Sequence, residues 1–201
     1  MASIYDLKPK FQNLLRPIVS QLAAIGITAN QITVLAMLLS FVAGSLIYMY
    51  PTQDWPLLAI PVVLFLRMAL NAIDGMLARE HNMKSSLGAI LNELGDVLSD
   101  AALYLPLAVI SGINPTLIVL VVLIAVISEM TGVIAIQIGA QRRYDGPMGK
   151  SDRAFVFGVI GLVLGLGYSI QPWLDYVLIV MLVLLCLTVI NRSKRALEEV
   201  K

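Results

Sequence analysis

The amino-acid sequence predicts an all-α integral membrane protein with six transmembrane helices and an N-terminal amphipathic helix at the membrane interface. Hydrophobic residues make up 59% of the 201 residues and charged residues only 13%. The mean hydropathy is +0.86, which is typical of a chain that folds in lipid. Long apolar runs alternate with short polar segments, and Lys and Arg gather in alternate segments. We therefore expect a single membrane domain over residues 1–201.

Each expected element follows from its local pattern. Residues 1–26 mix apolar side chains with Lys8, Lys10 and Arg16, which is typical of a helix lying in the interface. Six apolar runs follow, most of them close to the roughly 20 residues that cross a bilayer. They predict a six-helix bundle over residues 31–190, with spans at about 31–48, 57–79, 85–110, 117–139, 154–168 and 173–190. Residues 191–201 are expected to form a basic tail.

The positions of Lys and Arg predict the orientation. Except for Arg67, they lie at the N-terminus, in residues 79–84 and 142–153, and in the C-terminal tail. By the positive-inside rule, both termini and these loops face the cytoplasm, which suggests a bacterial inner (plasma) membrane. The single cysteine, Cys186, permits no intramolecular disulfide and is expected to be a buried apolar filler.

Most of the polar chemistry lies in residues 71–100. Read as helices, this stretch places two sets of residues on two faces: Asn71, Asp74, Gly75 and Ala78 on the first, and Gly88, Asn92, Asp96 and Asp100 on the second. Buried carboxylates need a cationic partner, and ligands that are all oxygen favour Mg²⁺, Mn²⁺ or Ca²⁺. Arg79 could hold a phosphate. The stretch therefore predicts a site for a metal-bound phosphate compound.

The same stretch resembles the signature of the CDP-alcohol phosphatidyltransferases, Asp-x-x-Asp-Gly-x-x-Ala-Arg, eight residues, Gly, three residues, Asp, three residues, Asp. Every spacing fits, but Asn71 and Asn92 replace the first and third aspartates. Residues 26–33 also resemble the family segment Gly-Ile-Thr-Pro-Asn-x-x-Thr, with Ala29 at the proline. Asparagine binds a divalent cation more weakly than aspartate. Three alternatives stay open: one metal, charge restored by Glu93 and Asp100, or an inactive site.

The resemblance implies transfer of a phosphatidyl group from CDP-diacylglycerol to an alcohol acceptor, with release of CMP and with Mg²⁺ or Mn²⁺ as cofactor. It implies a catalytic base at Asp96 and metal ligands at Asn71, Asp74, Asn92 and Asp96. Asp100 lies one turn beyond Asp96 on the same helix ridge, so it is the runner-up base or an added metal ligand. The resemblance also implies CDP-lipid binding by Asn30, Thr33, Gly75, Ala78, Arg79, Ser85 and Gly88. Acceptor binding is expected at Arg143, Lys150 and Arg153. The acceptor could carry a phosphate, as in glycerol 3-phosphate or an inositol phosphate. A homodimer in contact with membrane lipids is expected, and no nucleic-acid partner.

Several assignments have structural alternatives. Thr28 or Asn30 could cap the first span, and Ser85 could cap the third. Arg67 could pair with Glu129 or position the carboxylates of the site. The basic residues of the 142–153 loop could simply anchor it at lipid headgroups. For the whole protein, the alternatives are a catalytically silent CDP-lipid-binding regulator and, less favoured, a secondary transporter.

Overall fold

The computed structural model describes residues 4–168 and 173–201, and in these residues the regular elements are all helices. The α-helices are α1 (Ile4–Ala24), α2 (Ala29–Met49), α3 (Trp55–Glu80), α4 (Ser86–Tyr104), α5 (Pro115–Ile134), α6 (Lys150–Gly165) and α7 (Trp173–Glu199). Two short 3₁₀ helices, η1 (Leu105–Val109) and η2 (Ala135–Ile138), follow α4 and α5. The expectation of an all-helical membrane protein is confirmed.

Four helices in the described residues are long and apolar enough to cross a membrane: α2, α3, α7 and α5 together with η2. The predicted third span is interrupted, and the predicted fifth span begins and ends a few residues earlier than expected. The third divides into α4 and η1 at Leu105, because Pro106 has no N–H to donate and disfavours the α conformation of the residue before it. The fifth corresponds to α6, which has 16 residues.

The chain divides into two compact units. The first comprises Met1–Val42 and Val63–Ser99, and the second comprises Ala43–Val62 and Asp100–Lys201. Helices α2, α3 and α4 therefore each contribute one part to each unit. The predicted metal and nucleotide residues fall in the first unit, apart from Asp100, and the predicted acceptor residues fall in the second.

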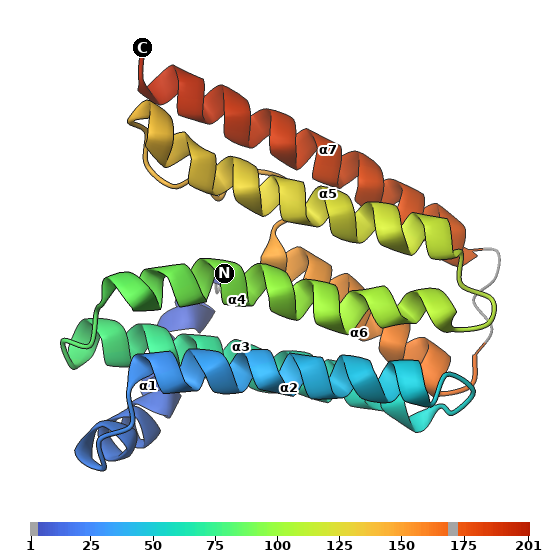
Figure 1. Ribbon diagram of the computed structural model, residues 1–201, viewed down its shortest axis with the longest axis horizontal. Helices are drawn as coiled ribbons and strands as arrows, with labels where there is room; N and C mark the ends of the chain where they lie inside the picture. Colours follow the sequence, from blue (N-terminus) through green and yellow to red (C-terminus); the bar gives the residue numbers. More distant parts are fainter. Residues whose placement is uncertain (1–3, 169–172) are drawn as a thin grey trace. The chain divides into compact units, whose positions relative to one another are not determined.

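In the first unit, α1 meets the beginning of α2 and the end of α3 (Figure 1). The core between them consists of Leu15, Val19, Ala29, Ile32, Ile73, Met76 and Leu77. Fully burying a side chain such as Leu77 stabilises the packing by about 1.5–3 kcal/mol. Arg16 forms an ion pair with Glu80 at 3.1 Å and ties α1 to the end of α3, and this pairing raises the pKa of Arg16. Leu14 remains 72% exposed, so α1 has a second apolar side, as an interfacial helix requires.

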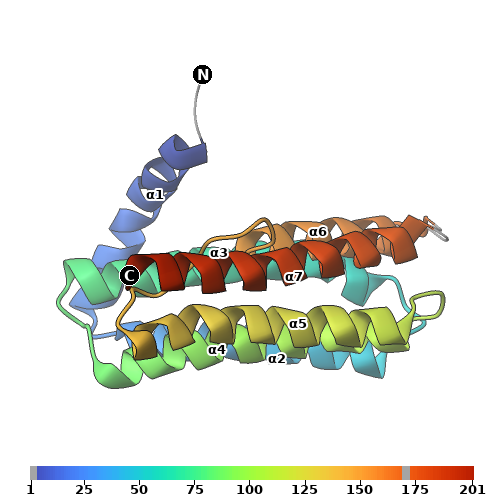
Figure 2. The same ribbon diagram turned by 90° about the horizontal axis from the view of Figure 1, so that it is seen from above.

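In the second unit, α5 and α7 lie side by side and run in the same direction (Figures 1 and 2).

Small residues allow other helices of the second unit to approach closely, as is common in membranes. A Cβ added to Gly44 of α2 would lie only 1.9 Å from the carbonyl oxygen of Ala102. Gly161 and Gly165 of α6 meet Ile60 and Leu58 of α3 in the same way.

Two expectations about α7 are wrong. The helix continues to Glu199, so residues 191–199 form its last turns and not a separate tail. These turns are helical because Thr188, Arg192 and Ala196 recur every four residues on one buried face. Cys186 is exposed, on a face that has no protein neighbour to bury it.

Candidate active site

The most buried predicted ligand is Asp74 of α3, which is 6% exposed. Its Oδ2 lies 2.7 Å from Oγ1 of Thr33 on α2. The same hydroxyl lies 3.1 Å from the carbonyl oxygen of Ala29. A hydroxyl has one proton, and the shorter contact to a carboxylate is the stronger one. Thr33 therefore donates to Asp74 and fixes one of its two oxygens.

The beginnings of α2 and α4 meet through short polar side chains. Thr28 caps α2: its Oγ1 accepts from the backbone N of Gln31 at 3.3 Å, and its own N donates to Oε1 of Gln31 at 2.8 Å. Ser85 caps α4, since its Oγ accepts from the backbone N of Gly88 at 2.9 Å. The amide Nδ2 of Asn30 lies 3.4 Å from the same Oγ. The capping alternatives are thus confirmed for Thr28 and Ser85, and Asn30 is left to link the two helices.

Gly88 and Gly75 leave space that other side chains occupy. A Cβ at Gly88 would lie 2.7 Å from Oδ1 of Asn30, so a larger residue would displace that amide. A Cβ at Gly75 would lie 3.2 Å from Nη2 of Arg79. The guanidinium of Arg79 therefore folds back along α3 over Gly75, one turn after Asp74. Ala78 is half-buried and packs against the core of the first unit.

The other predicted ligands lie on α3 and α4. Asn71 and Asp96 are half-buried, and Asn92 is exposed. Arg67, which is 3% exposed, donates from Nη2 to the backbone carbonyl of Asp96 at 3.3 Å. This contact joins α3 and α4, the two signature helices, at the predicted base Asp96. It supports the alternative in which Arg67 positions the carboxylates of the site. It also places a positive charge next to the backbone carbonyl of Asp96.

The ligand chemistry of the first unit fits a hard divalent cation. Asn71, Asp74, Asn92 and Asp96 offer oxygen atoms only. In the described part of the chain, no group of three or more His, Cys, Asp or Glu residues is arranged to hold a metal ion. Two of the four candidate ligands are the amides of Asn71 and Asn92. The assignment of these four ligands stays a prediction.

Asp100, the runner-up base, belongs to a different cluster. It is 5% exposed, and its Oδ2 accepts from Nη2 and Nε of Arg153 at 2.9 and 3.3 Å. Arg153 in turn donates from Nη2 to Oε1 of Glu129 at 3.1 Å. One oxygen of Asp100 is thus already bound by a guanidinium. Its roles as metal ligand and base stay predictions, and the contacts favour a structural role.

Glu129 of α5 is the centre of this cluster. Its two carboxylate oxygens are bound by Arg142 at 3.0 Å, Arg153 at 3.1 Å and Arg192 at 3.1 Å. Arg192, which is 2% exposed, also donates to the backbone carbonyls of Ser128 and Asp145. Sequence reasoning missed Arg192, because it was expected in a tail. Its four-residue spacing from the apolar face of α7 is the signal that would have found it.

The loop between η2 and α6 carries the predicted acceptor residues and is held from several directions. Arg143 donates to Oδ2 of Asp145 at 2.8 Å and to Oε2 of Glu199 at 2.6 Å. The neighbouring Arg143 guanidinium holds the pKa of the Asp145 carboxyl below its usual range. The backbone N of Met148 donates to Oγ1 of Thr188 at 3.0 Å. Lys150 and Arg153, expected in the loop, lie in the first turn of α6.

Gly132 makes this arrangement sterically possible. The backbone N of Arg143 donates to the carbonyl of Gly132 at 3.1 Å. A Cβ at Gly132 would lie 2.5 Å from the carbonyl oxygen of Arg143 and 2.9 Å from Nη1 of Arg142. The loop therefore lies directly on α5 at a position where only glycine fits.

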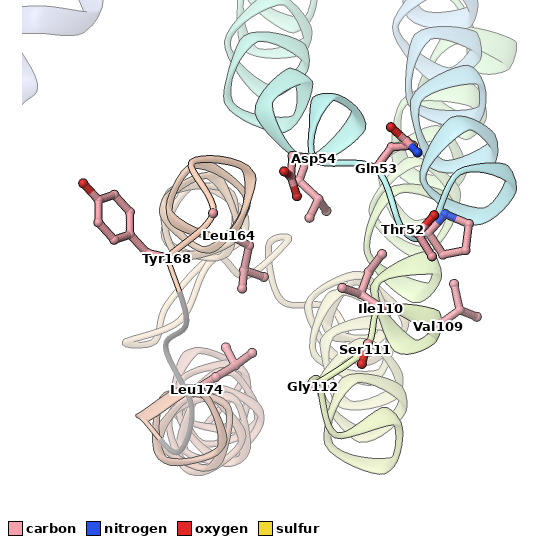
Figure 3. A pocket seen from close by; sticks show the side chains of 13 residues that line it. Thr52, Gln53, Asp54, Val109, Ile110, Ser111, Gly112, Leu164, Tyr168 and Leu174 are labelled. Carbon is pink, nitrogen blue, oxygen red and sulfur yellow. The ribbon is translucent and has the colours of Figure 1, made fainter.

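The second unit also contains a pocket of about 550 Å³ (Figure 3). It is lined by the α2–α3 loop at Pro51, Thr52, Gln53 and Asp54, and by Leu57, Val109, Ile110, Ser111, Gly112, Leu164, Gly167, Tyr168 and Leu174. Figure 3 shows Leu164 and Leu174 on one side and Ile110 on another, with Asp54 at the edge. None of the signature residues lines this pocket.

Comparison with known proteins identifies the class. The model of the CDP-alcohol phosphatidyltransferase family matches residues 26–191. The chain therefore belongs to the CDP-alcohol phosphatidyltransferase family, and the resemblance predicted from residues 71–96 is confirmed. The matched range includes the two signature helices and most of α7. It also includes the loop between η2 and α6 that carries the predicted acceptor residues, called the acceptor loop below.

Individual relatives add detail. The chain is 45% identical to the inner membrane protein YnbA of Escherichia coli (strain K12) over 195 residues, covering 97% of this chain and 96% of the relative. It is 34% identical to archaetidylinositol phosphate synthase of Pyrococcus horikoshii over 102 residues, which is 51% of this chain and about half (52%) of that relative.

Solved structures share the fold. Phosphatidylinositol phosphate synthase (PgsA1) of Mycobacterium tuberculosis, in complex with manganese and citrate, superposes with a TM-score of 0.73 at 20% identity. The superposition covers 90% of this chain and 88% of that one. The same enzyme with CDP-DAG bound gives a TM-score of 0.67 at 21% identity and covers 92% of both chains.

Proposed function

We propose that this membrane protein transfers a phosphatidyl group from CDP-diacylglycerol to the hydroxyl of an alcohol acceptor and releases CMP. The observation that carries the proposal is the signature on α3 and α4, with Asp74 buried and oriented by Thr33. A structural neighbour with CDP-DAG bound supports the donor substrate. A relative named for the synthesis of an inositol phosphate lipid supports an alcohol acceptor.

The donor would be held by groups at the ends of the signature helices. Asn30, Ser85 and Gly88 lie together at the start of α4, where backbone N–H groups and the helix dipole favour a diphosphate, and Thr33 would contact the donor beside Asp74. Arg79, folded over Gly75, supplies a guanidinium for phosphate oxygens. The small side chains at Gly75 and Ala78 would let the nucleotide approach the backbone of α3.

Mg²⁺ or Mn²⁺ would be held by Asp74 and Asp96 with the amide oxygens of Asn71 and Asn92. Bound there, the metal would neutralise the charge of the donor's diphosphate, including the charge that develops on CMP as it leaves. The neighbour solved with manganese supports this choice of ion. By fixing one oxygen of Asp74, Thr33 would leave the other oxygen oriented for the cation.

Asp96 would act as general base. The acceptor hydroxyl loses its proton to the Asp96 carboxylate while its oxygen attacks the phosphorus that carries the diacylglycerol. A new phosphorus–oxygen bond forms, the bond from that phosphorus to the oxygen of CMP breaks, and CMP leaves with the electron pair. Arg67 would hold the α4 backbone at Asp96 and so keep this carboxylate in position.

We further propose six membrane spans, with α4–η1 and α6 added to the four candidate spans, and with α1 lying at the membrane interface. We propose that the chain forms a single domain and assembles as a homodimer. The charge pattern supports a cytoplasmic location for both termini and for the active site. The relative described as an inner membrane protein supports the bacterial inner membrane. The acceptor would bind beside Arg143, Lys150 and Arg153.

The test is CMP release by the purified protein with CDP-diacylglycerol, Mn²⁺ and a series of alcohols, with the lipid product identified by mass. Asp74→Ala and Asp96→Ala should each lower turnover by about a hundredfold or more. Glu198→Gln, an exposed carboxylate paired with Arg195, is the matched control and should retain full turnover. Full activity of either aspartate variant would remove that residue from the mechanism.

Asn71 and Asn92 favour a second candidate, a CDP-lipid-binding protein without turnover. The double variant Asn71→Asp, Asn92→Asp restores the two missing carboxylates. If the natural protein binds CDP-diacylglycerol but releases no CMP, and the double variant does release it, the silent regulator is the correct function. If the natural protein is active, the second candidate is excluded.

A further inference from the structure

The basic residues expected to bind the acceptor are matched by carboxylates of the same chain. The second unit places five cationic side chains around the acceptor loop: Arg142, Arg143, Lys150, Arg153 and Arg192. Five carboxylates of the same unit lie on α4, α5, the loop itself, α6 and α7: Asp100, Glu129, Asp145, Asp152 and Glu199.

The four arginines are held by these carboxylates through direct contacts. Arg153 pairs with Asp100 at 2.9 Å and with Glu129 at 3.1 Å. The side chains of Arg142 and Arg192 bind the other oxygen of Glu129. At the more exposed edge, Arg143 is shared between Asp145 and Glu199. Each guanidinium therefore already has the partner that an acceptor phosphate would have to displace.

The start of α6 is occupied in the same way. A helix N-terminus next to Gly149 and Lys150 is the kind of position that binds anions. Here the carboxylate of Asp152, on the first turn, accepts from the backbone N of Gly149 at 2.8 Å. The negative charge that this helix end favours is thus supplied by the chain itself.

Among the described residues, one buried N–H group of the four arginines has no hydrogen-bond partner. Nη1 of Arg153 is buried and makes no hydrogen bond with any residue in the described ranges 4–168 and 173–201. The charge of that guanidinium is nonetheless matched, because its Nε and Nη2 bind Asp100 and Glu129. Because the positive charge of Arg153 is already matched, its remaining N–H group suits a neutral oxygen, such as that of a water or a hydroxyl group, better than a phosphate dianion.

From this closed set of ion pairs we infer that the acceptor is a neutral polyol, with no phosphate of its own. The inference rests on the proposed transfer reaction and specifies its acceptor. A phosphate placed beside this loop would meet arginines that already pair with carboxylates, and it would have to break ion pairs that are largely shielded from solvent. Hydroxyl groups can share hydrogen bonds with the same guanidinium and carboxylate groups without changing their charge.

The experiment compares matched alcohol pairs, glycerol with glycerol 3-phosphate and inositol with inositol 1-phosphate. The full-length protein is given CDP-diacylglycerol and Mn²⁺, and the products are identified by mass. We expect kcat/KM to be at least tenfold higher for the neutral member of a pair. A preference for the phosphorylated member would overturn the inference and keep the transfer reaction. CMP release with none of the alcohols would overturn the transfer reaction and the inference with it.

Two neighbouring glutamates allow a second experiment that tests the same inference at single residues. Glu199→Gln removes one carboxylate from Arg143 and leaves the loop with one unmatched positive charge, whereas Glu198→Gln only loses its contact with Arg195. We expect Glu199→Gln to raise kcat/KM for the phosphorylated alcohols about fivefold, and Glu198→Gln to leave it unchanged. Equal values for both variants would show that charge balance at this loop does not select the acceptor, which would overturn the inference.

Discussion

At the scale of single residues, Thr33 makes a contact that the sequence did not predict. Besides its proposed contact with the CDP-lipid, its hydroxyl donates to Asp74 at 2.7 Å. A hydrogen bond to a charged group contributes about 1.5–3 kcal/mol. A threonine on one helix therefore determines how a ligand on the next helix is oriented.

We predict that Thr33→Val lowers kcat about 10- to 100-fold and raises the Mn²⁺ concentration needed for half-maximal turnover, because Asp74 loses its orienting donor. Thr33→Ser, which keeps the hydroxyl, should restore most of the activity. Turnover as a function of Mn²⁺ concentration measures both effects.

The control for Thr33→Val is Thr131→Val, since the Thr131 hydroxyl bonds only within α5, to the carbonyl of Ile127 at 2.8 Å. An unchanged metal requirement in Thr33→Val would limit Thr33 to lipid contact.

At the scale of helices, close packing depends on a few glycines. Gly44 of α2 faces the backbone carbonyl of Ala102, where an added Cβ would lie at 1.9 Å. Gly95 of α4 has only Thr33 Cγ2 near its added Cβ, at 3.7 Å, which is ordinary van der Waals contact. The two positions differ in their neighbours. The backbone carbonyl of Ala102 is fixed within a helix and cannot move away from a side chain at position 44, whereas a side chain at position 95 meets only ordinary contact with Thr33.

We predict that Gly44→Ala destabilises the protein by about 1–3 kcal/mol, because α2 and Ala102 must separate. Gly95→Ala should be neutral or slightly stabilising, since alanine favours helix by about 0.5–1 kcal/mol over glycine. Thermal unfolding in detergent, followed by circular dichroism, provides the comparison. A similar melting temperature for both variants would contradict the tight contact at Gly44.

Helix types and many boundaries could be predicted from the apolar runs, because lipid requires each spanning segment to satisfy its own backbone. The signature helices were also predictable, since Asp74 and Asp96 follow a fixed spacing. The end of α4 was missed although Pro106 marks it. The burial of Arg192 could have been predicted from its spacing on α7, but its pairing with Glu129 could not. The two residues lie 63 positions apart, and no local periodicity reports which distant charges will meet.

At the scale of the whole molecule, the arrangement in the membrane can be tested at α4, the signature helix that falls outside the four candidate spans. Lys84 precedes this helix, and Ser111 follows η1. In a six-span protein these two residues lie on opposite sides of the membrane. If α4 does not cross, they lie on the same side.

We predict that a membrane-impermeant maleimide labels Ser111→Cys in intact cells, and labels Lys84→Cys only after the inner membrane is opened. Both cysteines are introduced together with Cys186→Ser, because the natural thiol is exposed. Labelling of the two positions from the same side would rule out the six-span arrangement.

The contacts of Glu129 also have a consequence for how the protein is made. This carboxylate enters the membrane with α5, yet Arg153 and Arg192 belong to segments that are synthesised later. Until α6 and α7 arrive, a nascent chain inserted as far as α5 carries an acidic group that lipid does not tolerate well. A chain interrupted before residue 192 would therefore keep an incompletely neutralised Glu129, so the last helix is needed to complete the charge pairing of α5.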